Sequence, residues 1–368
     1  MNRQLEDWVL AALTPGIGPA ALLELVRAFG SISAALDASR ASLAAVVGAG
    51  PADALKQGAA TDARDAAMDW SLRPDGFLLT LLDDDYPPQL AEADTPPPLL
   101  FGRGRRDLLV RPMLAVVGSR NAFEPACATA QEFAASLSAH GYTVVSGMAS
   151  GIDSAAHKGA LQHAASTIAV IGNGIDRVYP ASNHALARQI ARDGLILSEF
   201  PLGAKPLAHH FPRRNRIIAG LCRACLVVEA SVESGSLITA RMALEAGREV
   251  MAIPGSIHNP QARGCHRLIK QGAKLVETVD DILDEVGRLP AAPEIMHTIS
   301  SPVSDHPVAR VLGHEALTID EMSTRLGLTA ADLYAMLLQL ELEGRVASLP
   351  GGRFQWLGSF GAGSACTQ

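Results

Sequence analysis

Short apolar runs alternate with longer amphipathic segments through the middle of the chain, between residues 113 and 276. Runs of four or five apolar residues are typical of strands buried on both faces, and apolar residues spaced three or four positions apart are typical of helices. The pattern therefore predicts an α/β fold with about seven strands in a doubly wound, mostly parallel sheet. The predicted strands are Met113–Val117, Thr143–Val145, Thr167–Ile171, Leu195–Ser198, Ala224–Val228, a run within 248–255, and Ala273–Val276.

Helices are predicted between these strands at about 125–140, 183–192, 236–246 and 265–271, and a further helix should begin at Asp153 or Ser154. A strand–helix–strand unit has a fixed handedness, which brings the carboxyl ends of parallel strands to one edge of the sheet. We therefore expect the loops that follow the strands to meet at that edge and to form the ligand site.

Smaller segments flank this main domain. Residues 1–72 are rich in alanine and leucine and predict a helical, helix-hairpin-helix or SAM-like domain with a turn at Gly16-Ile17-Gly18. Such a turn can hold a phosphate or simply join two helices, and the sparse bases nearby favour the second interpretation. The main Rossmann-like domain is assigned to 73–286 with its core motifs in 111–285, a linker to 287–306, a winged helix to 307–357, and a flexible tail to 358–368.

The segment 307–357 has the pattern of a winged helix-turn-helix. Thr318 and Glu321 can form a capping box, and two short strands are expected around 350–352. The expected recognition helix, 330–341, carries acids and no base, and the whole segment has six acids against four arginines. Because a DNA reader needs arginine or lysine at the groove, we favour a protein-binding or regulatory role for this segment over DNA binding.

Charge is distributed unevenly along the chain. Its 368 residues carry a formal net charge of −7, which argues against a protein that coats nucleic acid with its whole surface. The stretch from Phe200 to Val228 nevertheless contains five basic residues and no acid. A local positive field on an acidic protein should attract a polyanion to one place.

Two strand-end loops carry candidate anion-binding chemistry. Arg120 directly follows the first strand, and the arginines of residues 213–216 lie in the acid-free stretch, on what we expect to be a turn. Arginine forks and the backbone amides of glycine turns are donors that suit phosphate. One or two of these three arginines can pair with Glu199 or Glu229. We expect at least one of them to be structural, because neighbouring residues on a turn point in different directions.

A rival interpretation is an enzyme that processes a nucleotide, with Glu229, Glu233 or His157 as general acid or base. The segment EASVESGSLIT at 229–239 loosely resembles the phosphate loop of nucleoside-monophosphate phosphoribohydrolases. No serine or cysteine nucleophile stands at a recognisable spacing from a base, so we expect His157 to tie its loop by hydrogen bonds. The dinucleotide fingerprint GxGxxG is absent, and no cofactor is expected.

A zinc site is a third possibility that the residues offer. Cys222, Cys225, Cys265 and His266 could together close a tetrahedral site. However, Cys225 begins an apolar strand, and a free cysteine is commonly a small buried hydrophobe. This favours a protein without a metal.

The remaining composition predicts a cytoplasmic protein. No run approaches the roughly twenty apolar residues that a membrane-spanning helix needs, and the first ten residues carry acids where a signal peptide would be basic and then apolar. Five cysteines scattered along the chain fit a reducing compartment better than a disulfide framework.

Three motifs resemble those of one known family. GSR at 118–120, SGMASGIDSAAHKGAL at 146–161 and the long block at 211–255 are similar to the bacterial DprA (Smf) family of DNA-processing proteins. The motifs cover roughly 110–285, and the flanking units fit the longer members. The resemblance implies an extended Rossmann-like core that binds and protects single-stranded DNA, helps to load the RecA recombinase in natural transformation and recombination, forms homodimers and has no catalytic activity.

The resemblance also implies which residues contact DNA. The arginine after the first strand corresponds to Arg120, and the FPxRNR motif corresponds to 211–216; where some members carry a lysine after YP this chain has Ala181, so that this cation is missing or is supplied by Arg177 or Lys205. Phe211 and His210 are candidates for base stacking. The predicted DNA-binding residues are Gly118, Ser119, Arg120, Gly147, Gly151, Lys205, His210, Phe211, Arg213, Arg214, Asn215, Arg216, Ser234, Gly235 and Ser236, and no catalytic or metal residue is predicted.

Overall fold

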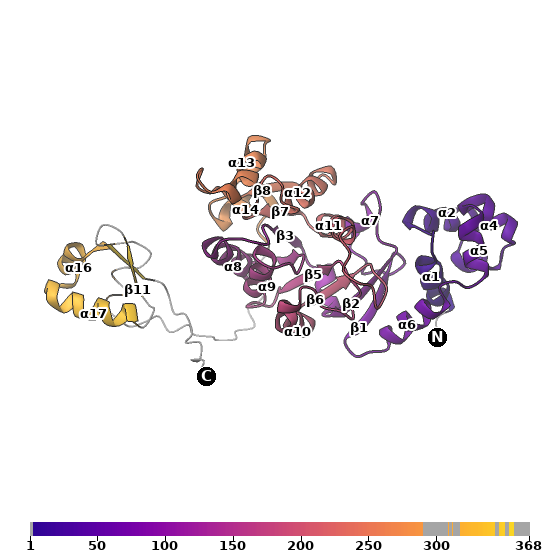
Figure 1. Cartoon of the computed structure of the whole chain (residues 1–368), viewed down its shortest axis with the longest axis horizontal. Coiled ribbons are helices and arrows are strands. Elements are labelled where there is room, and N and C mark those ends of the chain that lie inside the picture. Colours follow the sequence, from indigo (N-terminus) through magenta and orange to yellow (C-terminus); the bar gives the residue numbers. More distant parts are fainter. Residues whose placement is uncertain are drawn as a thin grey trace. The chain divides into compact units, whose positions relative to one another are not determined.

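The computed structural model describes residues 3–289, 308, 311, 317–342, 346–349 and 353–356. These residues belong to two compact units, Met1–Ala292 and Pro293–Gln368. The first unit contains a large central sheet with helices around it, and the second contains a small sheet with helices (Figure 1).

A nine-stranded sheet forms the centre of the first unit, in the order β1-β2-β6-β5-β4-β3-β7-β8-β9. The strands β3 to β9 are parallel to their neighbours in that group, whereas β2 is antiparallel to both β1 and β6. This confirms the predicted doubly wound, mostly parallel sheet. The strands are β1 Gly76–Thr80, β2 Leu99–Gly104, β3 Met113–Val117, β4 Thr143–Ser146, β5 Thr167–Ile171, β6 Leu195–Ser198, β7 Ala224–Val227, β8 Glu249–Ala252 and β9 Lys274–Leu275.

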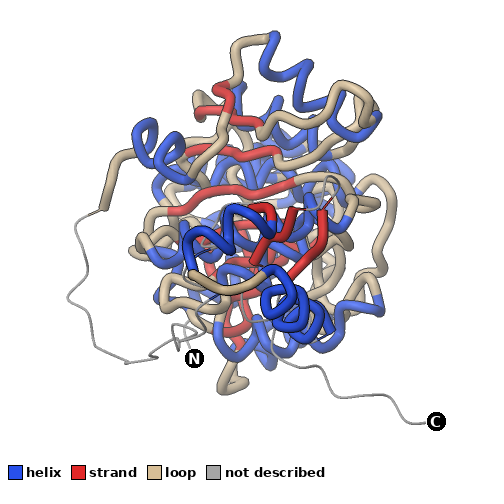
Figure 2. The backbone as a smooth tube through the Cα atoms, turned by 90° about the vertical axis from the view of Figure 1, so that its left-hand side faces the viewer, coloured by secondary structure: helices blue, strands red, loops and turns tan. Residues whose placement is uncertain are grey.

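Helices cover both faces of this sheet, because successive strand residues point to opposite faces. In β3, Leu114 and Val116 pack against one layer of helices and Ala115 and Val117 against the other. Figure 2 shows the strands stacked through the centre of the unit with helices on both sides. One layer contains α8 Glu124–Ala139, α9 Ile152–Ala160, α10 His184–Asp193 and α14 Val279–Val286; the other contains α11 His210–Leu221, α12 Ser236–Glu245 and α13 Arg263–Lys270.

Short helices precede the sheet, as the alanine- and leucine-rich sequence predicts. The indole nitrogens of Trp8 and Trp70 donate hydrogen bonds to the carbonyls of Pro98 and Gly102, which ties these helices to the β1–β2 side of the sheet. Gly16 packs against a proline ring, which fits a tight turn between two helices. The helices are α1 Arg3–Leu13, α2 Pro19–Phe29, α3 Ile32–Asp37, α4 Arg40–Val47, α5 Ala49–Lys56, α6 Thr61–Ser71 and, before β2, α7 Pro88–Ala91.

The second unit has the predicted helix-turn-helix and strands. Thr318 and Glu321 form the expected capping box at the start of α16 Ile319–Leu326, and Gly327 ends that helix in the left-handed conformation. The next helix is α17 Ala330–Leu342, and the sheet order is β10-β12-β11 with β10 Leu317–Thr318, β11 Val346–Leu349 and β12 Arg353–Trp356. The predicted tail and most of the predicted linker lie outside the described residues.

The largest departure from expectation is the arginine run 213–216, which lies on helix α11 and not on a turn. The reason is visible in the residue spacing. Counted from Arg214, the residues Ile217, Ile218 and Leu221 follow at three, four and seven positions, which is one face of a helix, and all four are buried. The arginine takes a place in the buried stripe where an apolar residue is usual.

Candidate functional site

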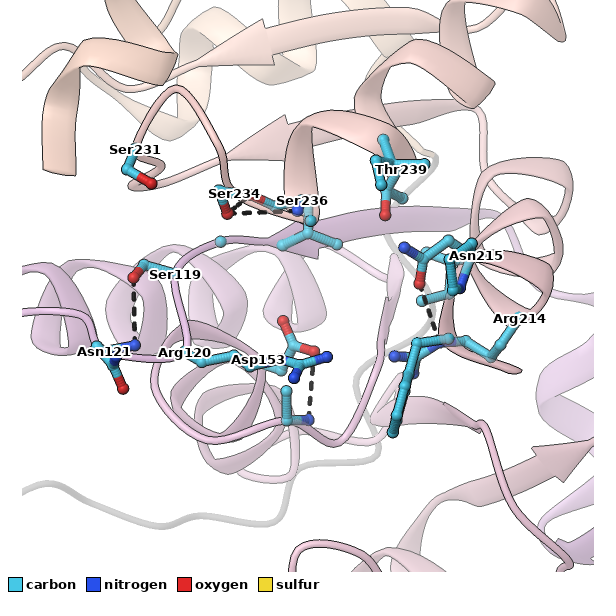
Figure 3. Close-up of a pocket in the computed structure, with 18 of the residues that line it drawn as sticks. Ser119, Arg120, Asn121, Asp153, Arg214, Asn215, Ser231, Ser234, Ser236 and Thr239 are labelled. Carbon is cyan, nitrogen blue, oxygen red and sulfur yellow. Dashed lines mark hydrogen bonds between the residues drawn. The ribbon is translucent and has the colours of Figure 1, made fainter. Parts of the chain in front are cut away.

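A cavity of about 520 Å³ opens at the carboxyl edge of the sheet, beyond the ends of β3 and β4. Figure 3 shows Ser119, Arg120 and Asn121 on one side of it, Arg214 and Asn215 on the other, and a serine-rich loop across the top. We call this cavity the central pocket. Its lining includes Gly118, Ser119, Arg120, Asn121, Asp153, Phe211, Arg214, Asn215, Ser231, Ser234, Gly235, Ser236, Thr239 and Gln261.

Most of the predicted contact residues meet in this pocket. Gly118, Ser119, Arg120, Phe211, Arg214, Asn215, Ser234, Gly235 and Ser236 all line it, although they come from three separate segments of the chain. The other predicted residues, Gly147, Gly151, Lys205, His210, Arg213 and Arg216, are not among its lining residues.

Arg120 is the exposed cation of the pocket. Its guanidinium lies over the ring of Phe211, with the central carbon 5.1 Å from the ring centroid. Among the residues that the structure describes, no carboxylate lies within 4.0 Å of this guanidinium. A cation held over an aromatic ring keeps its hydrogen-bond donors available to an anionic ligand.

Aromatic rings gather beside Arg120. The ring of Phe211 lies 5.8 Å from that of Tyr179, a residue that no motif in the sequence assigned to the site. His210 is less available for base stacking than predicted, because its ring stacks on Phe200 at 4.0 Å and its Nδ1 lies 3.1 Å from the carbonyl oxygen of Gly172. Burial holds the pKa of His210 below its ordinary value.

Arg214 is a structural residue. This agrees with the expectation that at least one of the arginines at 213–216 is structural. Its side chain is buried, and its Nη1 donates hydrogen bonds to the carbonyl oxygens of Gly147 and Val170, at the ends of β4 and β5. Its Nε donates to Oδ1 of Asn215 at 3.1 Å. Burial lowers the pKa of Arg214 to about 10, and the nearby carboxylate of Asp153 partly opposes this shift.

Arg213 and Arg216 share one carboxylate, that of Glu199. Arg213 Nε donates to Oε2 of Glu199 at 2.9 Å, and Arg216 Nη2 donates to the other oxygen. Of the two predicted partners, Glu199 therefore makes these ion pairs and Glu229 makes none with the described residues. Glu199, whose carboxylate pairs with these two arginines, directly precedes the acid-free stretch Phe200–Val228.

The predicted glycines serve close packing. A side-chain carbon on Gly147 would collide with the guanidinium of Arg214, and one on Gly151 would collide with the carbonyl oxygen of Ser119. Gly151 also has φ +74°, which favours glycine. Both residues thus let the loops around the pocket approach one another without themselves lining it.

The serine-rich loop supplies neutral donors at the start of α12. The hydroxyl oxygens of Ser234 and Ser236 lie 2.7 Å apart, and the backbone amide of Ser236 donates to Ser234 Oγ at 3.3 Å. A helix N-terminus and hydroxyl groups favour a negatively charged ligand. Figure 3 shows this loop facing Ser119 and Arg120 across the pocket.

Asp153 is a pocket residue that the sequence reasoning placed only at a helix start. Its side chain is buried at the base of the pocket, where Oδ2 accepts a hydrogen bond from the amide of Ala149 at 3.3 Å. Burial raises the pKa of Asp153, and the charge of Arg214 opposes the rise. A carboxylate in the first turn of a helix that follows a strand-end glycine is the signal that could have placed it here.

The residues proposed for an enzyme do not gather in the central pocket. His157 is fully buried, with Nδ1 2.7 Å from Thr167 Oγ1, and burial lowers its pKa to about 3. This confirms that it ties its segment by a hydrogen bond. Glu229 lines a neighbouring cavity and Glu233 another one.

The cysteines proposed for zinc are buried. Burial raises the pKa of the Cys225 thiol to about 12 and that of the Cys265 thiol to about 12. His266 Nε2 lies 2.9 Å from the carbonyl oxygen of Gly255. Within the described part of the chain, no three His, Cys, Asp or Glu side chains are grouped to hold a metal ion, and no helix there is long and apolar enough to cross a membrane.

Two family models match the chain. The model described as DNA recombination-mediator protein A matches residues 77–287, more than half of the chain, and the model described as DprA winged helix domain matches residues 299–352. The chain belongs to the DprA family. The membership confirms the resemblance that the motifs carry, and it covers both the sheet domain and the C-terminal segment.

Named relatives agree with this membership. Protein Smf of Escherichia coli (strain K12) is 42% identical over 299 residues, which cover 78% of this chain and 79% of that protein. DNA processing protein DprA of Streptococcus pneumoniae is 50% identical over 206 residues, which cover 56% of this chain and 73% of that protein.

Two DprA structures share the fold. The X-ray structure of DprA from Streptococcus pneumoniae matches with a TM-score of 0.66 and 39% identity, over 77% of this chain and 98% of that one. The structure of DprA from Helicobacter pylori, described by its single-stranded DNA binding mode, matches with a TM-score of 0.52 and 26% identity, over 57% of this chain and 95% of that one.

Proposed function

We propose that this protein binds single-stranded DNA in the central pocket, protects the strand, and helps to load a RecA-type recombinase during natural transformation and recombination. The observation that carries the proposal is the pairing of Arg120 with Phe211 at the mouth of the pocket. A phosphate and a base are neighbours in a nucleotide, and here a cation with available donors lies against an aromatic ring. The Helicobacter pylori relative adds support, since its structure is described by a single-stranded DNA binding mode and it belongs to the same family.

Backbone charge should supply most of the affinity. Aromatic residues make up 4% of the chain, which limits base stacking. Phosphate neutralisation releases counterions and carries no sequence information, so binding should fall steeply as salt rises. A single strand fits the site better than a duplex, because its bases are free to meet Phe211 and Tyr179.

Gel-shift titrations with matched single- and double-stranded oligonucleotides across a salt series test this function. The expected result is binding of the single strand at low salt, weaker binding of the duplex, and a linear fall of log affinity with log salt concentration. Equal affinity for the two forms, or no dependence on salt, would contradict the proposal.

The recombinase partnership rests on the family and on one surface. In the second unit, Tyr334 and Leu338 are exposed one turn apart on α17, on a helix whose neighbours Asp332 and Glu341 are acidic. An exposed apolar pair between acids suits a protein partner better than DNA. RecA filament growth on a strand coated with single-strand-binding protein should accelerate when this protein is added, and an unchanged rate would oppose the loading role.

We also propose that the protein forms a homodimer. A cavity of about 610 Å³ lies between α12 and α13, and Val232, Ile238 and Leu244 are exposed beside it. Exposed apolar side chains around a groove are typical of an interface between protein chains. Light scattering should give twice the mass of one chain, and Leu244→Glu should shift it to the mass of a monomer; a monomer at every concentration would exclude the dimer.

We propose no catalytic step for this protein. The central pocket lacks the three residues suggested as general acids or bases, because His157, Glu229 and Glu233 are not among its lining residues. Incubation with nucleoside monophosphates, followed by measurement of released base, should give no product above the background rate.

A further inference from the structure

One buried carboxylate in the first unit lacks a hydrogen-bond partner on one of its oxygens. Glu229, which stands shortly after β7, is 5% exposed, and its Oε2 accepts a hydrogen bond from Asn259 Nδ2 at 3.2 Å. Its Oε1 is buried and has no partner among the described residues. A buried acceptor left without a donor costs free energy, so a donor from outside the chain is a natural explanation.

Glu229 lines a second cavity of about 620 Å³, which we call the side pocket. The side pocket lies between the start of α8 and the loop after β8, and most of its other walls are apolar. They include Phe123, Val228, Ile253, Pro254 and Pro260, and the Phe123 side chain is 57% exposed. A mostly apolar pocket with a small number of polar groups is the usual form of a site for a small organic group, and a nucleic-acid base is one such group.

The side pocket adjoins the central pocket at the same edge of the sheet. The amide of Ser119 donates to the backbone carbonyl of Glu229 at 2.7 Å, so that the loop carrying Arg120 is fixed to the residue that lines the side pocket. On the other side, Asn259 Oδ1 accepts a hydrogen bond from the amide of Gln261, and Gln261 lines the central pocket. A strand held at Arg120 can therefore present a neighbouring base to Glu229.

We propose that the side pocket takes one base of the bound strand and that Glu229 selects guanine there. This inference rests on the proposed binding of single-stranded DNA. A carboxylate only accepts hydrogen bonds, and guanine presents two adjacent donors, N1–H and the N2 amino group, on its Watson–Crick edge. Thymine presents one N–H between two carbonyl oxygens, which the carboxylate repels. Phe123 at the rim is placed to cover the face of the base.

A metal ion is the other class of ligand that an unpartnered carboxylate could serve. Calcium and magnesium need six or more oxygen ligands, and among the described residues no group of three or more His, Cys, Asp or Glu side chains is arranged to hold a metal ion. The apolar walls of the side pocket also favour a base over a hydrated ion.

Fluorescence anisotropy with two labelled strands tests the proposal. One strand is thymine throughout, about twelve nucleotides long, and the other carries a single central guanine. The full-length protein should bind the guanine strand about tenfold more tightly, which is the discrimination expected of one good base contact. In Glu229→Gln the ratio of the two affinities should fall to about one, whereas the exposed matched control Glu277→Gln, outside both pockets, should keep it.

The outcomes separate the side pocket from the function on which it rests. If neither strand binds, both the proposed function and this inference fail. If the thymine strand binds and the ratio is one in the unmodified protein, only the side pocket fails. Two further strands carry cytosine or adenine in place of the central guanine, and tighter binding of either would overturn the assignment. A guanine preference that survives in Glu229→Gln would do the same. Phe123→Ala, at an exposed position, supplies a second variant should Glu229→Gln melt early, and it should reduce the same ratio.

Discussion

Arg120 and Arg214 line the same pocket and differ in almost everything else. Arg120 is exposed, lies over the ring of Phe211 and has no carboxylate partner among the described residues. Arg214 is buried, and its donors are taken by the carbonyls of Gly147 and Val170 and by Asn215. One arginine is placed to meet a ligand, and the other joins the ends of two strands to the helix that faces them.

The difference between these two arginines shows that the number of charged residues in a stretch of sequence does not give the electrostatic potential at the protein surface. The stretch Phe200–Val228 contains no acid, yet Glu199 neutralises Arg213 and Arg216, and Arg214 is removed from the surface. Among the described residues that line the central pocket, the exposed cation is Arg120, which follows another strand. We therefore expect Arg120 to contribute more to anion binding than Arg213, Arg214 or Arg216.

Replacement of Arg214 should have the largest effect of any change considered. Arg214→Met removes the donors to two strand ends and leaves Asp153 buried without its nearby cation, so that the free energy of unfolding should fall by about 4 kcal/mol. Urea denaturation followed by circular dichroism measures this loss. The matched control Arg188→Met, at an exposed position on α10, should change stability by less than about 0.5 kcal/mol.

The stability of the Arg214→Met variant also tests whether Arg214 is structural or contacts the ligand. A variant that unfolds at the same urea concentration as the unmodified protein, but no longer binds DNA, would make Arg214 a ligand contact and would contradict the structural role. We expect instead that any loss of binding follows the loss of the folded state.

His157 is buried, as Arg214 is, and it should make the free energy of unfolding depend on pH. Burial and the charge of Arg214 lower its pKa to about 3 from 6.5. The unfolded chain therefore takes up the proton first as pH falls below 6.5, and stability is lost progressively toward pH 3. The loss between pH 7 and pH 4 should be roughly 3 kcal/mol, since each pKa unit is worth about 1.4 kcal/mol. Urea titrations at each pH measure it, and His157→Gln should lose this part of the slope; an identical slope in that variant would contradict the assignment.

Glu199→Gln should have an intermediate effect, because it breaks the ion pairs that neutralise α11. The Glu199 carboxylate is buried and accepts from both Arg213 and Arg216, and its loss should lower the free energy of unfolding by about 2 kcal/mol. The same change releases two cations, so DNA binding should depend more steeply on salt. An unchanged salt slope would mean that these arginines do not reach the strand even when they are unpaired.

The fold was predictable in detail because the strands of the central sheet are buried on both faces. Strands β3, β5 and β6 have the boundaries expected from their apolar runs alone. Helix α11 escaped prediction because a buried arginine interrupts the apolar stripe that would have revealed it. Hydrophobic periodicity does not reveal a buried helix face that includes an arginine, because the hydrogen bonds from that arginine to backbone carbonyls far away in the sequence cannot be read from the pattern.

The candidate site was predictable in its location and less so in its contacts. Strand-end loops meet at one edge in any parallel sheet, so Arg120 and Ser234 were correctly expected to come together, and Phe211 joins them from the first turn of α11. The partner of each arginine could not be read from the sequence, because Glu199 and Glu229 are equally close to the acid-free stretch and only the three-dimensional arrangement distinguishes them. The contribution of Tyr179 likewise depends on how its loop folds over Phe211.

The smallest effects are expected for Arg120 and Arg213, which are both accessible to solvent but differ in their partners. These two residues also give the most direct test of whether an available arginine binds DNA more tightly than a paired one. Arg120→Ala should weaken single-strand binding about tenfold with little change in melting temperature, because a desolvated phosphate contact is lost and no internal bond is broken. Arg213 is 51% exposed but already paired with Glu199, so Arg213→Ala should weaken binding by less than about threefold. Anisotropy titrations at one salt concentration compare the two variants directly. If Arg213→Ala cost more affinity than Arg120→Ala, the paired arginine outside the central pocket would be the main contact to the strand, and the distinction between paired and available arginines would not govern binding.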